Sequence, residues 1–402
     1  MSRAWRRSAL SAENKVSSPN SPVAGQVVVS PVQSKGDLDE FIKLPWRLYS
    51  ENRYWIPPLL RLQHELLSPK TNPYFQHADV QLLIARRNGE PVGRISAQVD
   101  HEHNRFHNER TGLFGFFESV EDPEVARALT TAAESWLREQ GMDRLRGPMN
   151  FSANGEIGFL LSGFDMPPMV LMPYTHEYYL RLMEGCGYTK IKDLYAYRWD
   201  RQPVAEGPPA RMVRALRKRP EVKVRRANMK DFREEVRTIL RLYNDSFAQN
   251  WGFVPATEAE ADQMSSDLKL LVDPQIVPFV EINGKPAGVA LAIPNLNEAI
   301  YDLNGRLFPF GFIKLVWRLK VRRVRTGRLV ILGIAKEFRT REYAGLAYLL
   351  CDELYHRGIE RGYDWAEFSW TLEDNHLINN LIEKVDAVRY KTYRLYEKEL
   401  SP

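Results

Sequence analysis

Two short hairpin patterns, around positions 88 and 283, constrain the fold of this chain more than any other feature. Residues 82–97 place Asn88 and Gly89 between two apolar segments, and residues 278–292 repeat this plan around Asn283 and Gly284. An Asn-Gly pair is a strong signal of a two-residue hairpin, because both turn positions need a positive φ. In each copy a proline and then a glycine follow the turn at matched spacing. The sequence therefore predicts an internal duplication.

The elements that follow each hairpin also agree in order. A strand from Leu113 or from Leu329 leads into an amphipathic helix, at about 125–140 or 343–361, and each copy ends in a strand with alternating tyrosines. We therefore expect an α/β fold with mixed α+β sheets, built as two tandem domains. The divisions are a tail without periodicity at 1–36, a first domain at 37–204 and a second domain at 205–402.

The bulk composition supports this division and indicates the cellular compartment in which the protein is located. A chain of 402 residues is long for one hydrophobic core. It has no apolar run near the roughly 20 residues that cross a bilayer, and no apolar stretch follows its basic start. The two cysteines, Cys186 and Cys351, are too few for a disulfide framework. These features predict a cytoplasmic protein.

The loop before the central helix of the second half carries a more specific signal. It reads Arg339-Thr340-Arg341-Glu342-Tyr343-Ala344, within an expected order of strand, helix, helix, hairpin, strand, helix, strand, helix, strand from Val222 to about Leu400. Both the order and the loop resemble the GNAT superfamily of acyl-CoA N-acyltransferases, whose loop pattern is Arg/Gln-x-x-Gly-x-Gly/Ala. In that family the loop and the helix N-terminus bind the pyrophosphate of coenzyme A. The resemblance implies acyl-CoA as co-substrate, bound by Arg339, Thr340, Arg341 and Ala344.

Two departures from the family pattern distinguish the halves. Glu342 replaces the central glycine and puts a carboxylate where phosphate would bind, which Arg341 and Lys336 partly offset. The first half has no such loop. Its helix starts with Asp122 in an N-cap context and with Pro123, which favours a helix but repels phosphate. We therefore expect the first domain to be the more degenerate copy.

The resemblance also implies roles for residues near this loop. Backbone N–H groups of Leu332, Gly333 and Ile334 would hold the oxyanion and the cofactor, and Asn375 would contact the pantetheine arm or simply cap the next helix. The tyrosine that the family uses as general acid is missing, since Ile382 occupies the expected place. Tyr390 or Tyr393 is a substitute, and Glu367 is a candidate general base; simple packing of the alternating strand is the alternative for the tyrosines, and a solvated polar face is the alternative for Glu367.

The first half contains a second set of candidate catalytic residues. His103 and His107 are spaced to share one helix face, and with a carboxylate they suit either base catalysis or a metal; Glu118 belongs to the same polar cluster. Only two histidines share the face and no cysteine joins them, so we expect a base and no metal. The alternative is a pair of solvated histidines.

Residues 306–328 alternate aromatic and basic side chains, among them Phe308, Phe310, Trp317, Lys314 and Arg318. Such an amphipathic segment predicts peripheral contact with an anionic membrane. A solvated helix face and a basic rim around the CoA phosphates are alternative interpretations. The net charge of +5 comes with no recognised nucleic-acid-binding motif, so we expect no nucleic acid partner.

Phrases along nearly the whole chain, such as NRYWIPPLL, HNRFHNE, RGPMNFS and SWTLEDN, are similar to a bacterial group of GNAT-like proteins. That group includes ceramide-synthase-type N-acyltransferases, so the resemblance implies transfer of an acyl group to an amine, such as a long-chain sphingoid amine. Two alternatives stay open. One is a tandem-GNAT transferase that uses aminoacyl-tRNA, and the other is a ligand-binding module without catalysis.

Overall fold

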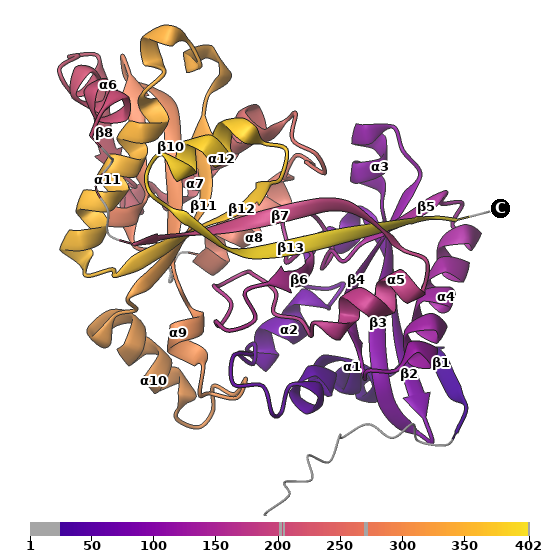
Figure 1. Ribbon diagram of the computed structural model, residues 1–402. Helices are drawn as coiled ribbons and strands as arrows, with labels where there is room; N and C mark the ends of the chain where they lie inside the picture. The colour runs from indigo at the N-terminus through magenta and orange to yellow at the C-terminus, as the bar shows by residue number, and fades with distance from the viewer. Residues whose placement is uncertain (1–24, 201–202, 204–205, 269–271, 401–402) are drawn as a thin grey trace, which may run out of the picture.

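The computed structural model describes residues 25–200, 203, 206–268 and 272–400, and the thirteen strands within these ranges form one mixed sheet (Figure 1). Twelve of them follow the order β1-β2-β3-β4-β5-β13-β7-β12-β11-β10-β9-β8, and β6 pairs with β13. The sheet therefore runs without interruption through both halves of the chain. Within these ranges no helix combines the length and the apolar character that a membrane span requires.

The first half builds one end of this sheet. Its elements are β1 (Val27–Pro31), α1 (Lys35–Leu48), α2 (Leu60–Leu66), the short 3₁₀ segment η1 (Pro73–Gln76), β2 (Ala78–Arg87), β3 (Glu90–Asp100), α3 (His101–His107), β4 (Thr111–Ser119), α4 (Pro123–Glu139), β5 (Arg144–Gly147), β6 (Phe159–Ser162), α5 (Tyr178–Gly185) and β7 (Thr189–Asp200). Structure thus begins at β1, inside the range 1–36 that the sequence suggested as a tail. Residues 1–24 of that range lie outside the described residues.

The second half repeats the plan at the other end. Its elements are α6 (Pro208–Arg217), β8 (Val222–Arg226), the short 3₁₀ segment η2 (Met229–Asp231), α7 (Phe232–Phe247), α8 (Glu258–Leu268), the short 3₁₀ segment η3 (Pro274–Ile276), β9 (Pro278–Ile282), β10 (Lys285–Pro294), α9 (Asn297–Ile300), α10 (Gly311–Trp317), the π-helical turn η4 (Arg318–Arg322), β11 (Thr326–Ile334), the 3₁₀ segments η5 (Lys336–Phe338) and η6 (Arg341–Tyr343), α11 (Leu346–Arg361), β12 (Trp365–Leu372), α12 (His376–Glu383) and β13 (Val388–Glu399). The insertion between β10 and β11, which contains α9 and α10, occupies the place of the short α3 in the first half.

The two hairpins form as their sequences predict. Strands β2 and β3 pair around Asn88 and Gly89, with φ of 53° and 84°, and β9 and β10 pair around Asn283 and Gly284, with φ of 50° and 78°. Positive φ at both positions matches the two-residue turn that an Asn-Gly pair favours. The duplication is therefore visible in backbone geometry as well as in element order.

The last strand of each half lies in the sheet of the other half. Strand β13, from the end of the chain, pairs with β5 of the first half, and β7, from the end of the first half, pairs with β12 of the second. The two strands also pair with each other, and Figure 1 shows them crossing the middle of the molecule side by side. This exchange joins the halves through backbone hydrogen bonds.

The hydrophobic cores also contain side chains exchanged between the halves. Tyr396 and Leu400, from the end of the chain, pack in the core that α4 shares with β2 and β3. Tyr197 and Trp199, from the first half, pack in the core beneath α11. Each half therefore completes its core with side chains from the other, which fixes the position of the interface where the candidate site lies.

Candidate active site

Strands β11 and β12 separate in the middle of the second half and leave an opening between them. They pair in parallel only from Thr326 with Trp365 to Leu329 with Phe368. Beyond Leu329, β11 continues to Ile334 with β10 on its other side. The backbone edge that includes Leu332, Gly333 and Ile334 therefore borders this opening and does not pair with β12. These are the three residues that the sequence suggested for oxyanion and cofactor contacts.

The loop between β11 and α11 lies directly beyond this edge. Arg339 donates hydrogen bonds to the carbonyl oxygens of Ile334 and of Ser246 on α7, both at 2.9 Å, so its side chain ties the loop to the end of β11. The N-cap residue of α11 is Gly345, which offers no side-chain cap to the helix. The remaining candidates, Thr340, Arg341 and Ala344, lie between Arg339 and this helix start. An uncapped helix N-terminus with nearby cations favours an anion.

Glu342, the residue that departs from the GNAT pattern, has a partner elsewhere in the chain. Its carboxylate forms an ion pair with Arg219, which follows α6, and its carbonyl oxygen accepts a further bond from Arg219 at 3.4 Å. Hydrogen bonds from Arg219 to Glu342 and then to Glu221 raise the pKa of the arginine. The negative charge of Glu342 is thus balanced by a cation that the sequence analysis did not associate with the loop.

The corresponding opening in the first half is filled by the chain itself. Strands β4 and β5 pair in parallel only as far as Leu113 with Arg146. Beyond that point the N–H of Met149 donates to Phe114 O at 2.7 Å, and the N–H of Phe116 donates to Asn150 Oδ1 at 2.8 Å. The backbone around Met149 and Asn150 therefore occupies the place that stays open between β11 and β12.

The helix start of the first half is also occupied. Asp122 caps α4 through a 2.8 Å bond from the N–H of Glu124, and Arg87 forms ion pairs with both carboxylates at 2.6 Å. The N-terminus of α4 therefore carries its own anions, as the acidic sequence predicts. The two halves differ at both features that would hold a nucleotide cofactor.

Glu367, on β12, lies buried beside the point where β11 and β12 separate. Its carboxylate accepts hydrogen bonds from the hydroxyls of Ser369 and Tyr390, and Nε of Arg328 lies 3.7 Å from its Oε1. Burial, followed by the charge of Glu367, raises the pKa of Tyr390. The structure thus brings together the two second-half residues proposed as base and acid.

Two buried cations near Glu367 were not found from the sequence. Arg328 donates to the carbonyl oxygens of Val170 and Leu171 of the first half, both at 3.0 Å. Lys391, whose pKa burial lowers to about 8, donates to Gly163 O and Met166 O at 2.7 Å. The sequence signal that could have identified Arg328 is that it is a single basic residue inside an otherwise apolar strand. Both cations hold the 163–171 segment of the first half over the site.

Glu156 connects the two halves electrostatically. Asn150 donates to its carboxylate at 3.2 Å. Burial raises the pKa of Glu156, and the guanidinium groups of Arg328 and Arg94 act in the opposite direction. A charged network from both halves therefore surrounds the interface near Glu367.

The first-half candidates do not form one site. Glu118, near the end of β4, accepts a 2.6 Å hydrogen bond from the hydroxyl of Tyr179, and burial raises the pKa of its carboxyl. His103 and His107 are on α3, which the 2.9 Å bond from the N–H of Thr111 to Asn104 fixes at the start of β4. The length of β4 thus separates the two histidines from Glu118.

The two histidines do share a helix face, with ring centroids 4.6 Å apart. Burial and then the neighbouring His107 lower the pKa of His103 to about 4. His107 lies 2.8 Å, through Nε2, from the carbonyl oxygen of Phe253 in the second half. Within the described ranges, no group of three or more His, Cys, Asp or Glu side chains could hold a metal ion.

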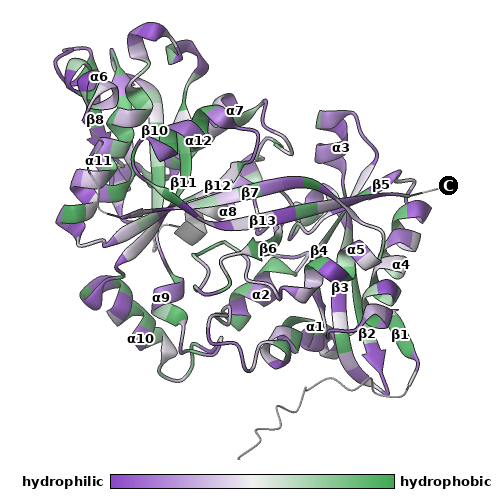
Figure 2. Ribbon diagram, in the orientation of Figure 1, coloured by the Kyte–Doolittle hydropathy of each residue, from purple (hydrophilic) through white to green (hydrophobic). Residues whose placement is uncertain are grey.

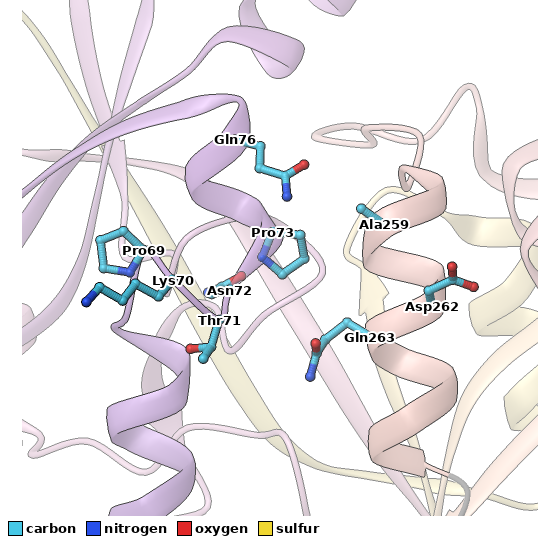
Figure 3. Close-up of a pocket in the computed structure, with 9 residues that line it drawn as sticks. All are labelled: Pro69, Lys70, Thr71, Asn72, Pro73, Gln76, Ala259, Asp262 and Gln263. Carbon is cyan, nitrogen blue, oxygen red and sulfur yellow. The ribbon is translucent and has the colours of Figure 1, made fainter.

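Asn375 acts as the N-cap of α12, where its side chain accepts a bond from the N–H of Ile378 at 3.3 Å. A cavity of about 410 Å³ lies between η1 and α8, and Figure 3 shows the side chains that line it. It is lined by Pro69, Lys70, Thr71, Asn72, Pro73, Gln76, Ala259, Asp262 and Gln263. The lining of this cavity includes none of the candidate residues.

Comparisons with known proteins agree with this architecture. No family model matches the chain. The chain is 42% identical to the bacterial ceramide synthase of Caulobacter vibrioides over 92% of its length and 97% of that protein, and 40% identical to protein YghO of Escherichia coli over 94% and 97%.

Solved structures share the fold at low identity. A tandem GNAT protein from the clavulanic acid biosynthesis pathway superposes with a TM-score of 0.55 at 13% identity, covering 94% of this chain and 99% of that one. An N-acetyltransferase of Sphaerobacter thermophilus gives 0.50 at 13% identity, covering 94% and 96%. The chain therefore belongs to the family of the bacterial ceramide synthase, with the tandem GNAT fold of an N-acyltransferase.

Proposed function

We propose that this protein transfers an acyl group from acyl-CoA to the amine of a long-chain, sphingoid-type lipid. The observation that carries the proposal is the end of β11–β12 pairing at Leu329, with an uncapped helix start after β11 and the hydrogen-bonded pair of buried Glu367 and half-buried Tyr390 beside it. Membership of the ceramide synthase family supports the choice of substrate.

Acyl-CoA binds in the second half in this proposal. Backbone N–H groups of Leu332, Gly333 and Ile334 contact the thioester end, and the loop with Arg339, Thr340, Arg341 and Ala344 receives the phosphates. Asn375 both caps α12 and borders the pantetheine arm. The filled opening and the acid-capped helix of the first half support a role for that domain as the copy without cofactor.

Glu367 and Tyr390 carry the chemistry. Glu367 accepts one proton of the ammonium group, the amine nitrogen then attacks the thioester carbonyl carbon and releases its second proton to solvent, and the carbon–sulfur bond breaks. Tyr390 supplies a proton to the leaving thiolate and regains one from the carboxyl of Glu367, to which it is hydrogen-bonded. The products are an amide and free CoA. Arg328 holds Glu367 in place.

In this proposal the first half contributes the binding site for the amine, which is the acceptor of the acyl group. Glu118 is the alternative general base, because its carboxyl is also buried and its pKa is raised. His103 and His107 are further candidate bases, and they lie on α3 next to the second-half segment that contains Phe253. The proposal places the protein in the cytoplasm, without a bound metal, and assigns contact with an anionic membrane to residues 306–328.

The test is release of free thiol by the purified protein, with short- and long-chain acyl-CoAs and a panel of amines that includes a sphingoid base. We expect release that depends on the amine and is fastest with a long-chain amine. No release from any acyl-CoA by folded protein would reject the proposal. An aminoacyl-tRNA-dependent transferase would instead show binding to tRNA that falls steeply with salt.

A further inference from the structure

The insertion between β10 and β11 exposes an unusual number of large apolar side chains. Phe308 is 85% exposed and Phe310 is 74% exposed, and Phe312, Ile313, Trp317 and Val321 also face solvent. Figure 2 shows apolar and polar residues interleaved along α10. We call residues 306–323 the α10 surface. Exposed apolar groups gathered on one segment mark a contact site more often than isolated ones do.

This exposure does not come from a loosely attached segment. Arg318 is buried and donates to Ala299 O at 2.9 Å and to Asp302 Oδ1 at 2.6 Å, so its side chain fixes η4 to α9. Ile300 and Leu303 pack beneath the segment against Leu59 of the first half. The segment therefore has its own small core and anchors, while its aromatic rings stay outside.

The charges of the segment are of one sign. Residues 306–323 contain six Lys or Arg residues and no Asp or Glu, and two of the six, Lys314 and the buried Arg318, pair with Asp302. Lys320 and Arg323 also line a cavity of about 170 Å³, together with Arg361 and a single acid, Asp273. The α10 surface thus combines apolar side chains for a hydrocarbon phase with cations for the phosphate layer above it.

We propose that the α10 surface docks on an anionic phospholipid bilayer, with its aromatic side chains in the interfacial layer and Lys320, Arg322 and Arg323 on lipid phosphates. A second copy of the same surface is a poor partner, because its exposed cations, Arg306, Lys320, Arg322 and Arg323, would face those of the other copy. Docking would bring the protein to the phase that holds a long-chain amine, a consequence that rests on the proposed function. The docking itself does not depend on it.

The test is sedimentation of the full chain with vesicles of phosphatidylcholine, with and without phosphatidylglycerol. We expect binding only when phosphatidylglycerol is present. A triple variant with Phe308→Ser, Phe310→Ser and Phe312→Ser should stay in the supernatant. Lys320→Gln with Arg322→Gln should weaken the partition coefficient by about tenfold or more, since each cation contributes on the order of 1 kcal/mol at such a surface.

Matched controls use residues outside the surface. Val28→Ser removes another exposed apolar side chain, and Lys35→Gln with Arg127→Gln removes two exposed cations of the first half. These variants should bind as the wild type does. Brominated lipid should quench part of the tryptophan fluorescence, and Trp317→Phe should remove that part.

Three results would overturn the proposal. One is wild-type protein that stays unbound with phosphatidylglycerol vesicles, and another is a triple phenylalanine variant that binds as well as wild type, which would indicate adsorption by charge alone. The third is self-association that the triple variant abolishes, without vesicle binding. Thiol release measured in detergent micelles keeps this test separate from the proposed function, because the triple variant should retain it.

Discussion

The hydroxyl of Tyr390 donates a hydrogen bond to Oε2 of Glu367 at the point where β11 and β12 separate. Tyr390 is on β13, the last strand, and Glu367 is on β12, so strand β7 lies between their backbones in the sheet. The pair therefore forms across a strand that comes from the first half. This arrangement couples the proposed chemistry to the strand exchange.

Replacing this hydroxyl tests its role as general acid. Tyr390→Phe should lower kcat for thiol release by about 10² to 10⁴, the usual contribution of a positioned acid, with little change in KM for acyl-CoA. Tyr195→Phe on the neighbouring β7 is the matched control and should keep kcat. Equal kcat for Tyr390→Phe and wild type would assign the tyrosine to packing only.

Arg219 is expected to protect the cofactor loop from the charge of Glu342. Arg219→Ala frees this carboxylate beside the loop proposed to bind phosphate, so the KM for acyl-CoA should rise, by up to about fivefold for an exposed pair of this kind. The double variant Arg219→Ala, Glu342→Ala should return KM to near the wild-type value. Steady-state kinetics of the four proteins form a complete cycle, and additive effects would show that the two residues do not act together.

Much of the fold was predictable because its signals are local. An Asn-Gly pair determines a hairpin from two residues, and Asp122 with Pro123 determines a helix start from neighbours in sequence. The strand exchange was not predictable in this way. Strands β7 and β13 have the same alternating pattern, and nothing within either segment distinguishes pairing in its own half from pairing in the other.

Prediction of the candidate site from the sequence was limited in the same way. Polar alternation on β12 pointed to Glu367, and i, i+4 spacing correctly placed the rings of His103 and His107 together. The partners of these carboxylates come from distant segments, as Arg328 does for the buried Glu367 and Arg219 for the exposed Glu342. Spacing also could not show that β4 separates the histidines from Glu118.

His77 predicts a pH dependence of stability at the interface between the halves. Its ring lies 3.2 Å from Asp100 of the first half, to which it is hydrogen-bonded, and 3.6 Å from Glu260 of the second, and these two carboxylates raise its pKa from 6.5 to about 10. Because the folded pKa is the higher one, the stabilisation is fully present below about pH 6.5 and is lost as pH rises towards 10.

The measurement is the free energy of unfolding between pH 6 and pH 10 for wild type and for His77→Gln. The wild type should lose a few kcal/mol more than the variant over the window between the two pKa values. The difference between the proteins isolates His77, since Lys391, with its pKa lowered to about 8, contributes in the opposite direction in both. Parallel curves would mean that the carboxylates do not hold the charged ring.

The strand exchange predicts that neither half folds alone, although each contains the complete element order of a domain. A fragment of residues 205–402 lacks β7, which leaves β12 without its neighbour and removes Tyr197 and Trp199 from the core under α11. A fragment of residues 1–204 lacks β13 and with it Tyr396, which completes the core beneath α4. Each fragment would expose a long strand edge and an incomplete core, the features that favour aggregation.

Expression of the two fragments, separately and together, tests this prediction. Separately they should be insoluble or should melt without cooperativity, whereas together they should copurify through a tag on one fragment and recover thiol release. The physical reason is that pairing of β7 with β13, and of each with the opposite half, forms only when both segments are present. A soluble 205–402 fragment with a cooperative melt would contradict the prediction, because its last strand would then have found a partner within its own half.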